Sequence, residues 1–157
     1  MKRRMALAAS AASLALVSWV GPATAQTMQS VAGTYMVTKV EAYGANARGR
    51  MVLTPDGRYS IMLARQALPK FAAGSRTKGT ADENKAVIEG SIFHYGKYTI
   101  DDGGKSITFH IETASFPNWD GTTQKRALKV AGDELTYTVT QPSAGGPPND
   151  VVWKRTK

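Results

Sequence analysis

Short runs of alternating apolar and polar residues, separated by tight-turn sequences, recur along the chain from residue 33 onward. Successive side chains of a β-strand point to opposite faces, so such runs predict half-buried strands. Pro55-Asp56-Gly57 separates two of the runs, at residues 50–54 and 58–65. Proline presets this turn, and glycine accepts the positive φ that a tight hairpin requires. Hairpins of this kind indicate an antiparallel sheet, because parallel strands need longer crossover connections.

Two more hairpins, a first strand and a last strand complete the predicted sheet. The remaining expected strands are residues 33–41, 92–100 and 105–113 around Asp101-Asp102-Gly103-Gly104, 123–130 and 134–140 around Ala131-Gly132-Asp133, 151–155, and a further candidate near 67–71. About eight hairpin-connected strands favour an all-β, up-and-down antiparallel barrel, with a sandwich as the alternative. Such a barrel encloses side chains or one small ligand. Thr80-Ala81-Asp82-Glu83 has the pattern of a capping box and predicts one short helix reaching about residue 89.

Residues 1–25 have the pattern of a cleavable secretion signal. Basic residues at positions 2–4 precede an apolar run through Val20, and Ala23-Thr24-Ala25 supplies the small-residue exit that a signal peptidase prefers. The apolar run is shorter than a membrane-spanning helix requires, and no second hydrophobic segment follows it. We therefore expect cleavage after Ala25 and a secreted or periplasmic protein. Residues 26–157 then form a single domain.

Composition argues against several classes of function. There is no cysteine, which excludes disulfides and thiolate metal ligands. Removing the three basic residues of the signal lowers the formal charge from +8 to +5, and the remaining basic residues are scattered, so we expect no nucleic-acid partner. No glycine-rich phosphate loop opens a helix, and His94, His110 and Glu112 lack the spacing of a metal site. We therefore expect neither a cofactor nor a metal. The oligomeric state is left open.

The strand at 123–130 carries two polar side chains in phase with its core residues. Gln124 and Arg126 share a face with Leu128 and Val130, whereas the lysines of this strand lie on the opposite face. An unpaired guanidinium inside a barrel would be costly. Arg126 therefore needs an internal partner, water near the mouth, or a ligand with an acidic or carbonyl group. Both an internal hydrogen-bond network and a ligand contact remain open.

Several segments in order carry a family resemblance: "GTYMVTKVE", "RGRMVLTPDGRYSIML", "LPKFAAG", "FHYGKYTID", "ITFHIETASFPNWDGTTQKRALKV" and "VVWKR". Together they resemble the bacterial lipocalin-like domain proteins, within the wider group of lipocalin and fatty-acid-binding barrels, over nearly the whole mature chain. Tyr35 stands where the lipocalin opening has tryptophan, and Arg155 from the last strand could cover it by stacking. The resemblance implies an antiparallel barrel with a central cavity. It singles out four residues for that cavity: His110, Asn118, Gln124 and Arg126.

The alternation of inward- and outward-facing residues in the strand at 92–100 gives two further candidate residues. His94 and Tyr98 share one face and could line the cavity. His110 is different, because Ile107, Phe109 and Ile111 define the opposite face of its strand. The apolar phase therefore places His110 outside, while the resemblance places it inside.

We expect from these features an exported lipocalin-like protein that binds a small, largely apolar ligand with a polar or acidic head group. The predicted ligand-binding residues are Gln124, Arg126, His110, Asn118, His94 and Tyr98. One alternative is a small cofactor-free isomerase, cyclase or hydrolase, with His110 as acid/base and Arg126 as an electrostatic clamp. Another is a structural barrel with a filled interior.

Overall fold

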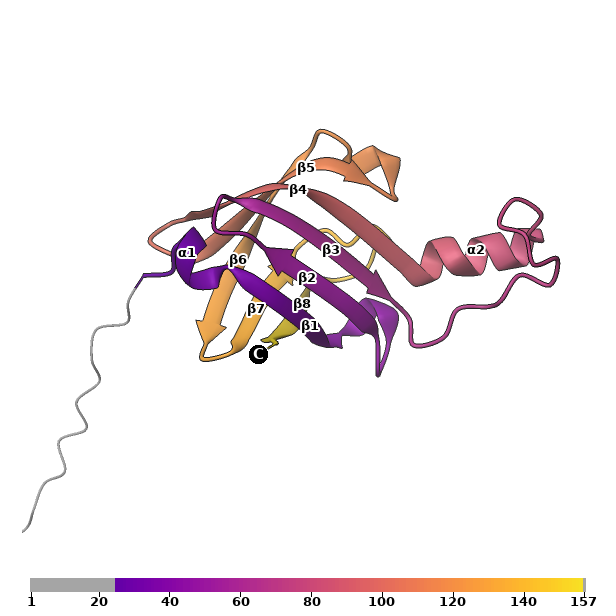
Figure 1. Ribbon diagram of the computed structural model, residues 1–157, viewed down its shortest axis with the longest axis horizontal. Helices are drawn as coiled ribbons and strands as arrows, with labels where there is room; N and C mark the ends of the chain where they lie inside the picture. Colours follow the sequence, from indigo (N-terminus) through magenta and orange to yellow (C-terminus); the bar gives the residue numbers. More distant parts are fainter. Residues whose placement is uncertain (1–24, 157) are drawn as a thin grey trace, which may run out of the picture.

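The computed structural model describes residues 25–156, so the predicted secretion signal, apart from Ala25, lies outside the described residues. Eight antiparallel strands follow one another around a closed barrel, and the last strand pairs with the first. Figure 1 shows the strands wrapping around a common interior. This confirms the predicted up-and-down barrel rather than the sandwich. Within the described part, no helix is both long and apolar enough to cross a membrane.

The strands agree closely with the predicted runs. They are β1 (Gly33–Val40), β2 (Arg48–Leu53), β3 (Arg58–Ala64), β4 (Ser91–Asp101), β5 (Ser106–Ala114), β6 (Thr123–Ala131), β7 (Glu134–Val139) and β8 (Asn149–Arg155). The candidate strand near residues 67–71 is wrong, since this segment belongs to the loop between β3 and the following helix. The barrel is already closed by the pairing of β8 with β1, without a strand from this segment.

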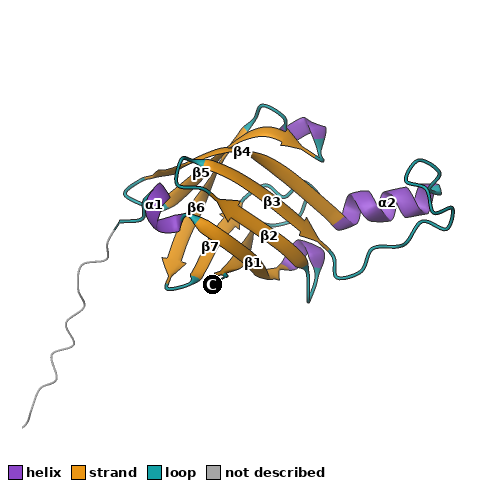
Figure 2. Ribbon diagram, viewed as in Figure 1, coloured by secondary structure: helices purple, strands orange, loops and turns teal. Residues whose placement is uncertain are grey.

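Short helices precede the first strand or connect later strands (Figure 2). They are α1 (Met28–Val31), the single-turn 3-10 helices η1 (Glu41–Tyr43) and η2 (Pro117–Trp119), and α2 (Ala81–Gly90). The predicted capping box is present at α2: Thr80 Oγ1 accepts from the Glu83 amide at 3.2 Å, and the Glu83 carboxylate accepts from the Thr80 amide at 2.8 Å. Figure 1 shows α2 and the loop before it projecting away from the barrel.

Large aromatic side chains fill the barrel toward the α1 end. Tyr35, Tyr98 and Trp153 are at most 1 % exposed. The Tyr98 hydroxyl donates to the carbonyls of Thr54 at 2.8 Å and Met28 at 3.2 Å, which ties β4 to the β2–β3 turn and to α1. This end of the described chain is therefore a packed aromatic core.

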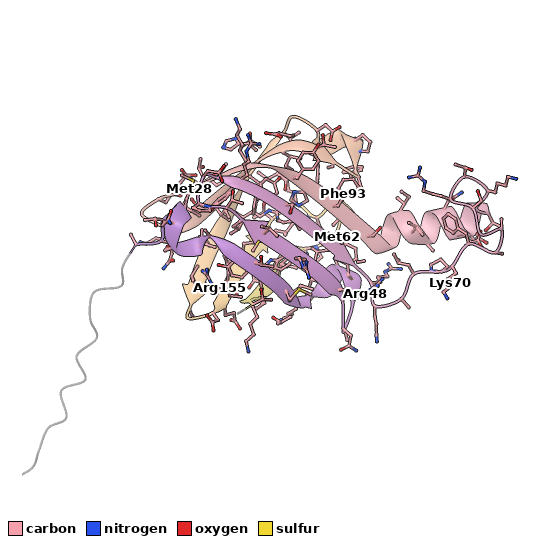
Figure 3. The ribbon with its side chains drawn as sticks, viewed as in Figure 1. Met28, Arg48, Met62, Lys70, Phe93 and Arg155 are labelled. Carbon is pink, nitrogen blue, oxygen red and sulfur yellow. The ribbon has the colours of Figure 1, made fainter. Side chains whose placement is uncertain are left out.

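Arg155 closes the same end from outside. Its guanidinium carbon lies 4.9 Å from the centre of the Tyr35 ring, and its N–H groups donate to the carbonyls of Ala32 and Ser30 just before β1. The stacking expected between Arg155 and Tyr35 is confirmed. Figure 3 shows Arg155 and Met28 together at this end of the molecule.

Candidate ligand-binding site

A cavity of about 70 Å³ lies inside the barrel at the end opposite α1. Its inner wall includes Leu63, Ile92, His94, Arg126, Tyr137 and Val151, and its mouth is formed by Tyr43 of η1, Trp119 of η2 and residues 142–144 of the β7–β8 loop. A larger groove, of about 540 Å³, lies on the outer wall beside Met62 and Phe93, which Figure 3 labels. Only the first of these two spaces is lined by buried polar side chains, those of His94 and Arg126, so it is the candidate site.

Arg126 supplies the charge of this cavity. Its side chain is 5 % exposed, and its guanidinium donates to Gln124 Oε1 at 2.6 Å. The guanidinium carbon lies 4.6 Å from the centre of the Tyr137 ring and 5.1 Å from that of Phe109. Across residues 25–156, no carboxylate forms an ion pair with Arg126. The positive charge is thus buried with a neutral hydrogen-bond acceptor and aromatic faces, but without a counter-charge.

The barrel wall is split beside Arg126. Residues 123–127 of β6 pair with β5, but β6 pairs with β7 only from Leu128 to Ala131. A hollow of about 280 Å³ occupies the gap and is lined by Gln124, Arg126, Val139 and residues 140–141. Arg126 and Val139 line this hollow as well as the internal cavity. Arg126 therefore stands between the cavity and a side opening of the barrel.

His94 lines the cavity from β4, which only β5 separates from the strand of Arg126. It is 3 % exposed, its Nδ1 lies 2.9 Å from the Tyr59 hydroxyl, and the Trp119 ring packs edge to face with it at 5.6 Å. Tyr59 can reach His94 diagonally because its direct partner in β4 is Gly96, which has no side chain. Burial, reinforced by the nearby Arg126 charge, lowers the pKa of His94 to about 3. The imidazole is therefore neutral at physiological pH.

The tyrosines around the cavity are neutral as well. Burial raises the pKa of Tyr43 to about 12, and it raises the pKa values of Tyr59 and Tyr137, where the Arg126 charge opposes the rise. The carboxylate of Glu89 borders the mouth, but its side chain is 55 % exposed and lies 3.8 Å from the Lys85 ammonium. The inner part of the cavity therefore carries the single positive charge of Arg126 between apolar and aromatic walls.

The model of the lipocalin-like domain family matches residues 25–156 of this chain. The chain belongs to the lipocalin-like domain family. It is also similar to the 4'-hydroxy-3'-methoxypropiophenone carrier protein ppsC of Aspergillus oryzae (strain ATCC 42149 / RIB 40), with 26 % identity over 89 residues, which cover 53 % of this chain and 80 % of that protein. The lipocalin-like barrel, its internal cavity and this distant relative together support a ligand-binding barrel.

The structure brings three of the predicted residues to this end of the lipocalin-like barrel. Gln124 and Arg126 point inward, as the phase of β6 indicated, and His94 lines the cavity. Contact between these residues and a ligand stays a prediction. No group of three or more histidine or acidic side chains suited to a metal ion occurs among the described residues.

The inward placement of His110 is wrong. Its side chain is exposed on the outer face of β5, where Nδ1 lies 3.3 Å from Thr123 Oγ1. Ile107, Phe109 and Ile111 occupy the inner face, so the apolar phase decides the orientation of this strand. His110 and Arg126 consequently lie on opposite sides of the barrel wall, and the expected acid/base and clamp pair does not share a cavity.

Two other predicted residues do not reach the cavity. Asn118 is exposed on η2, and its neighbour Trp119 contributes to the mouth instead. Tyr98 also faces inward, but it is the second inward-facing residue after His94 along β4. Because an extended strand advances steadily along the barrel, Tyr98 lies deeper, in the packed end where its hydroxyl bonds to Thr54.

Sequence reasoning missed Tyr59, Trp119 and Tyr137 as parts of the site. Tyr59 and Tyr137 alternate in phase with buried neighbours on β3 and β7, so the same strand phase that selected Arg126 would have placed them inside. Trp119 lies in a proline-initiated turn shortly before β6, the strand that carries Arg126, and its large ring in that turn was the available signal.

Proposed function

We propose that this protein is an exported carrier for a small, largely apolar ligand with an acidic or strongly accepting head group, which binds in the cavity beside Arg126. The observation that carries the proposal is the buried guanidinium, for which residues 25–156 supply no carboxylate partner. Burying an uncompensated charge is costly, and an anionic ligand oxygen would remove that cost through charge-assisted hydrogen bonds.

The size of the cavity limits the ligand. A cavity of roughly 150 Å³ holds one benzene molecule, whereas this cavity measures about 70 Å³. Without movement of side chains, it encloses a head group or part of one ring, and the remainder of the ligand lies in the mouth or in the gap between β6 and β7. Apolar contacts there supply about 25 cal/mol for each Å² removed from water. The geometry thus favours a compact aromatic compound over a long acyl chain.

The distant relative supports the same class of ligand. Its name describes a carrier of an aryl ketone that bears a phenolic hydroxyl group. The ring of such a compound suits the aromatic walls of this cavity, and its phenolic oxygen, once ionised, suits Arg126.

Export is supported by the pattern of residues 1–25, which have a basic start, an apolar run and an Ala23-Thr24-Ala25 exit. The test is the mass of the protein recovered from the exported fraction of the cells that make it. A chain that begins at Gln26 supports the proposal, and a full-length chain retained inside the cell contradicts it.

Binding is tested with protein that comprises residues 26–157. It is titrated with benzoate and with 4'-hydroxy-3'-methoxypropiophenone, by calorimetry and by tryptophan fluorescence, to which Trp119 at the mouth and the buried Trp153 both contribute. Arg126→Met is expected to weaken binding of the preferred compound about 10- to 100-fold, the range for lost hydrogen bonds to a charged group. Arg76→Met, on the exposed loop before α2, is the matched control and should leave binding unchanged. Equal affinity of both variants would contradict the proposed site.

A further inference from the structure

We propose that Tyr59 fixes His94 in the neutral tautomer with hydrogen on Nε2, so that the cavity offers donors from β4 and β6 and selects a planar aryl ligand with two acceptor oxygens. This inference rests on the proposed function, because it describes the ligand class of the same cavity. The two-oxygen group is a carboxylate or a phenolate with a neighbouring oxygen on the ring.

The tautomer follows from the hydrogen-bond capacity of the two side chains. Tyr59 is 4 % exposed, and its hydroxyl has only His94 Nδ1 as a partner among the described residues. If Nδ1 carried the hydrogen, it would donate to the tyrosine oxygen, and the hydroxyl hydrogen of Tyr59 would be buried without an acceptor. If Tyr59 donates to Nδ1 instead, both groups are satisfied. The hydrogen of the neutral imidazole then lies on Nε2.

Nε2 of His94 is free to meet a ligand. It makes no hydrogen bond within residues 25–156, and His94 lines the cavity. Nε2 is also not among the fully buried, unpartnered side-chain atoms of the described chain, so open space lies beside it. A buried N–H next to open space is a binding group for an acceptor atom.

The two donors act on the same ligand group. His94 and Arg126 both line the cavity, and the Arg126 charge is close enough to lower the pKa of His94. Arg126 offers N–H groups with a positive charge, and His94 offers one N–H without charge. This combination favours a single negative charge spread over two oxygens. It disfavours amines and ammonium groups, because the inner cavity has no carboxylate to receive them.

The tautomer is tested first by nitrogen NMR of the imidazole rings at pH 7. The chain contains two histidines, so the His110→Gln variant assigns the signals of His94. We expect a neutral His94 ring with hydrogen on Nε2, and a shift toward the other tautomer in Tyr59→Phe. A charged ring, or hydrogen on Nδ1 in the unaltered protein, would overturn the inference.

The donor role is tested by titrating benzoate, 4'-hydroxy-3'-methoxypropiophenone and benzylamine into protein comprising residues 26–157. His94→Phe keeps a packed ring but removes the donor, and it should weaken the preferred oxygen compound about tenfold. His94→Gln restores an N–H donor and should recover part of that loss. His110→Gln, on the outer face, should have no effect, and benzylamine should not bind.

The outcomes separate the two proposals. Tighter binding of benzoate identifies the carboxylate as the preferred source of the two oxygens, and tighter binding of the aryl ketone identifies the phenolate. Unchanged affinity in a folded His94→Phe variant, together with loss of binding in Arg126→Met, overturns the role of His94 and leaves the carrier function intact. Failure of both oxygen compounds to bind the unaltered protein overturns the proposed ligand class together with this inference.

Discussion

Replacing Arg126 by methionine is expected to weaken ligand binding with little effect on the stability of the empty barrel. In the structure, the guanidinium of Arg126 donates to Gln124 and contacts the rings of Phe109 and Tyr137, but no carboxylate within the described chain forms an ion pair with it. A methionine side chain has a similar length and can pack between the same two rings.

The magnitude follows from two opposing contributions to the free energy of unfolding. The substitution removes the charge-assisted hydrogen bond to Gln124, about 1.5–3 kcal/mol, and two cation–π contacts, which are worth about 2 kcal/mol each away from water. It also removes the cost of holding a guanidinium away from water, which is several kcal/mol in proteins. The two contributions are of similar size, so we expect the free energy of unfolding to change by less than about 2 kcal/mol and the Tm by less than about 8 °C in a domain of this size.

Urea unfolding, followed by tryptophan fluorescence, measures this change. Arg126→Met should stay within about 2 kcal/mol of the unaltered protein with an unchanged slope, and the exposed-loop control Arg76→Met should stay within about 0.5 kcal/mol. A loss of more than about 2 kcal/mol in Arg126→Met would refute the reasoning, since removing an unpaired buried charge should not cost that much. It would show that Arg126 belongs to a satisfied internal network, as in a structural barrel with a filled interior.

Three further predictions concern the cap of α2, the stacking of Arg155 and the pH dependence of stability. Thr80→Ala removes the hydroxyl that caps α2. It should lower the free energy of unfolding by about 1 kcal/mol without changing ligand affinity, as measured by urea unfolding and calorimetry. Arg155→Met loses its ring stacking and its bonds to backbone carbonyls, and this loss should cost about 2–3 kcal/mol in the same unfolding assay. Arg58→Met loses only an exposed ion pair with Asp56 and should cost far less, because water screens such pairs. Stability should also fall as the pH drops from 6.5 toward 3. The pKa of His94 is about 3 in the folded chain and near 6.5 in the unfolded chain. The unfolded chain therefore takes up the proton at a higher pH than the folded chain, and acid favours unfolding. The free energy of unfolding should fall by up to about 1.4 kcal/mol per pH unit in this range. Urea unfolding at pH 7 and at pH 4 measures the fall, which should be smaller in His94→Phe and unchanged in His110→Gln.

Features of the fold that depend on neighbouring residues were predictable from the sequence. The Pro55-Asp56-Gly57 turn forms as expected, with Gly57 at positive φ, because its residues set the backbone angles locally. Strand phase placed Gln124 and Arg126 inside the barrel, since alternation depends only on the order of residues. The same phase placed His110 outside, and the structure agrees with the phase rather than with the resemblance.

Features that depend on distant contacts were not predictable from strand phase. The Tyr59–His94 pair joins residues 35 positions apart and requires the register of β3 against β4. Phase places Tyr98 on the same face as His94, but it does not say how deep in the barrel each residue lies. The gap beside Arg126 arises because β6 and β7 pair over only part of their lengths, which alternation along one strand cannot reveal.

The measurement that tests the central claim most directly is the mass of the protein under native and denaturing conditions, after purification from the exported fraction of its own cells. The account predicts an additional mass that is lost on denaturation, that belongs to a small anionic aromatic compound, and that is absent from Arg126→Met prepared in the same way. A bare protein, or an adduct retained equally by Arg126→Met, would contradict a carrier whose ligand is held by the buried guanidinium.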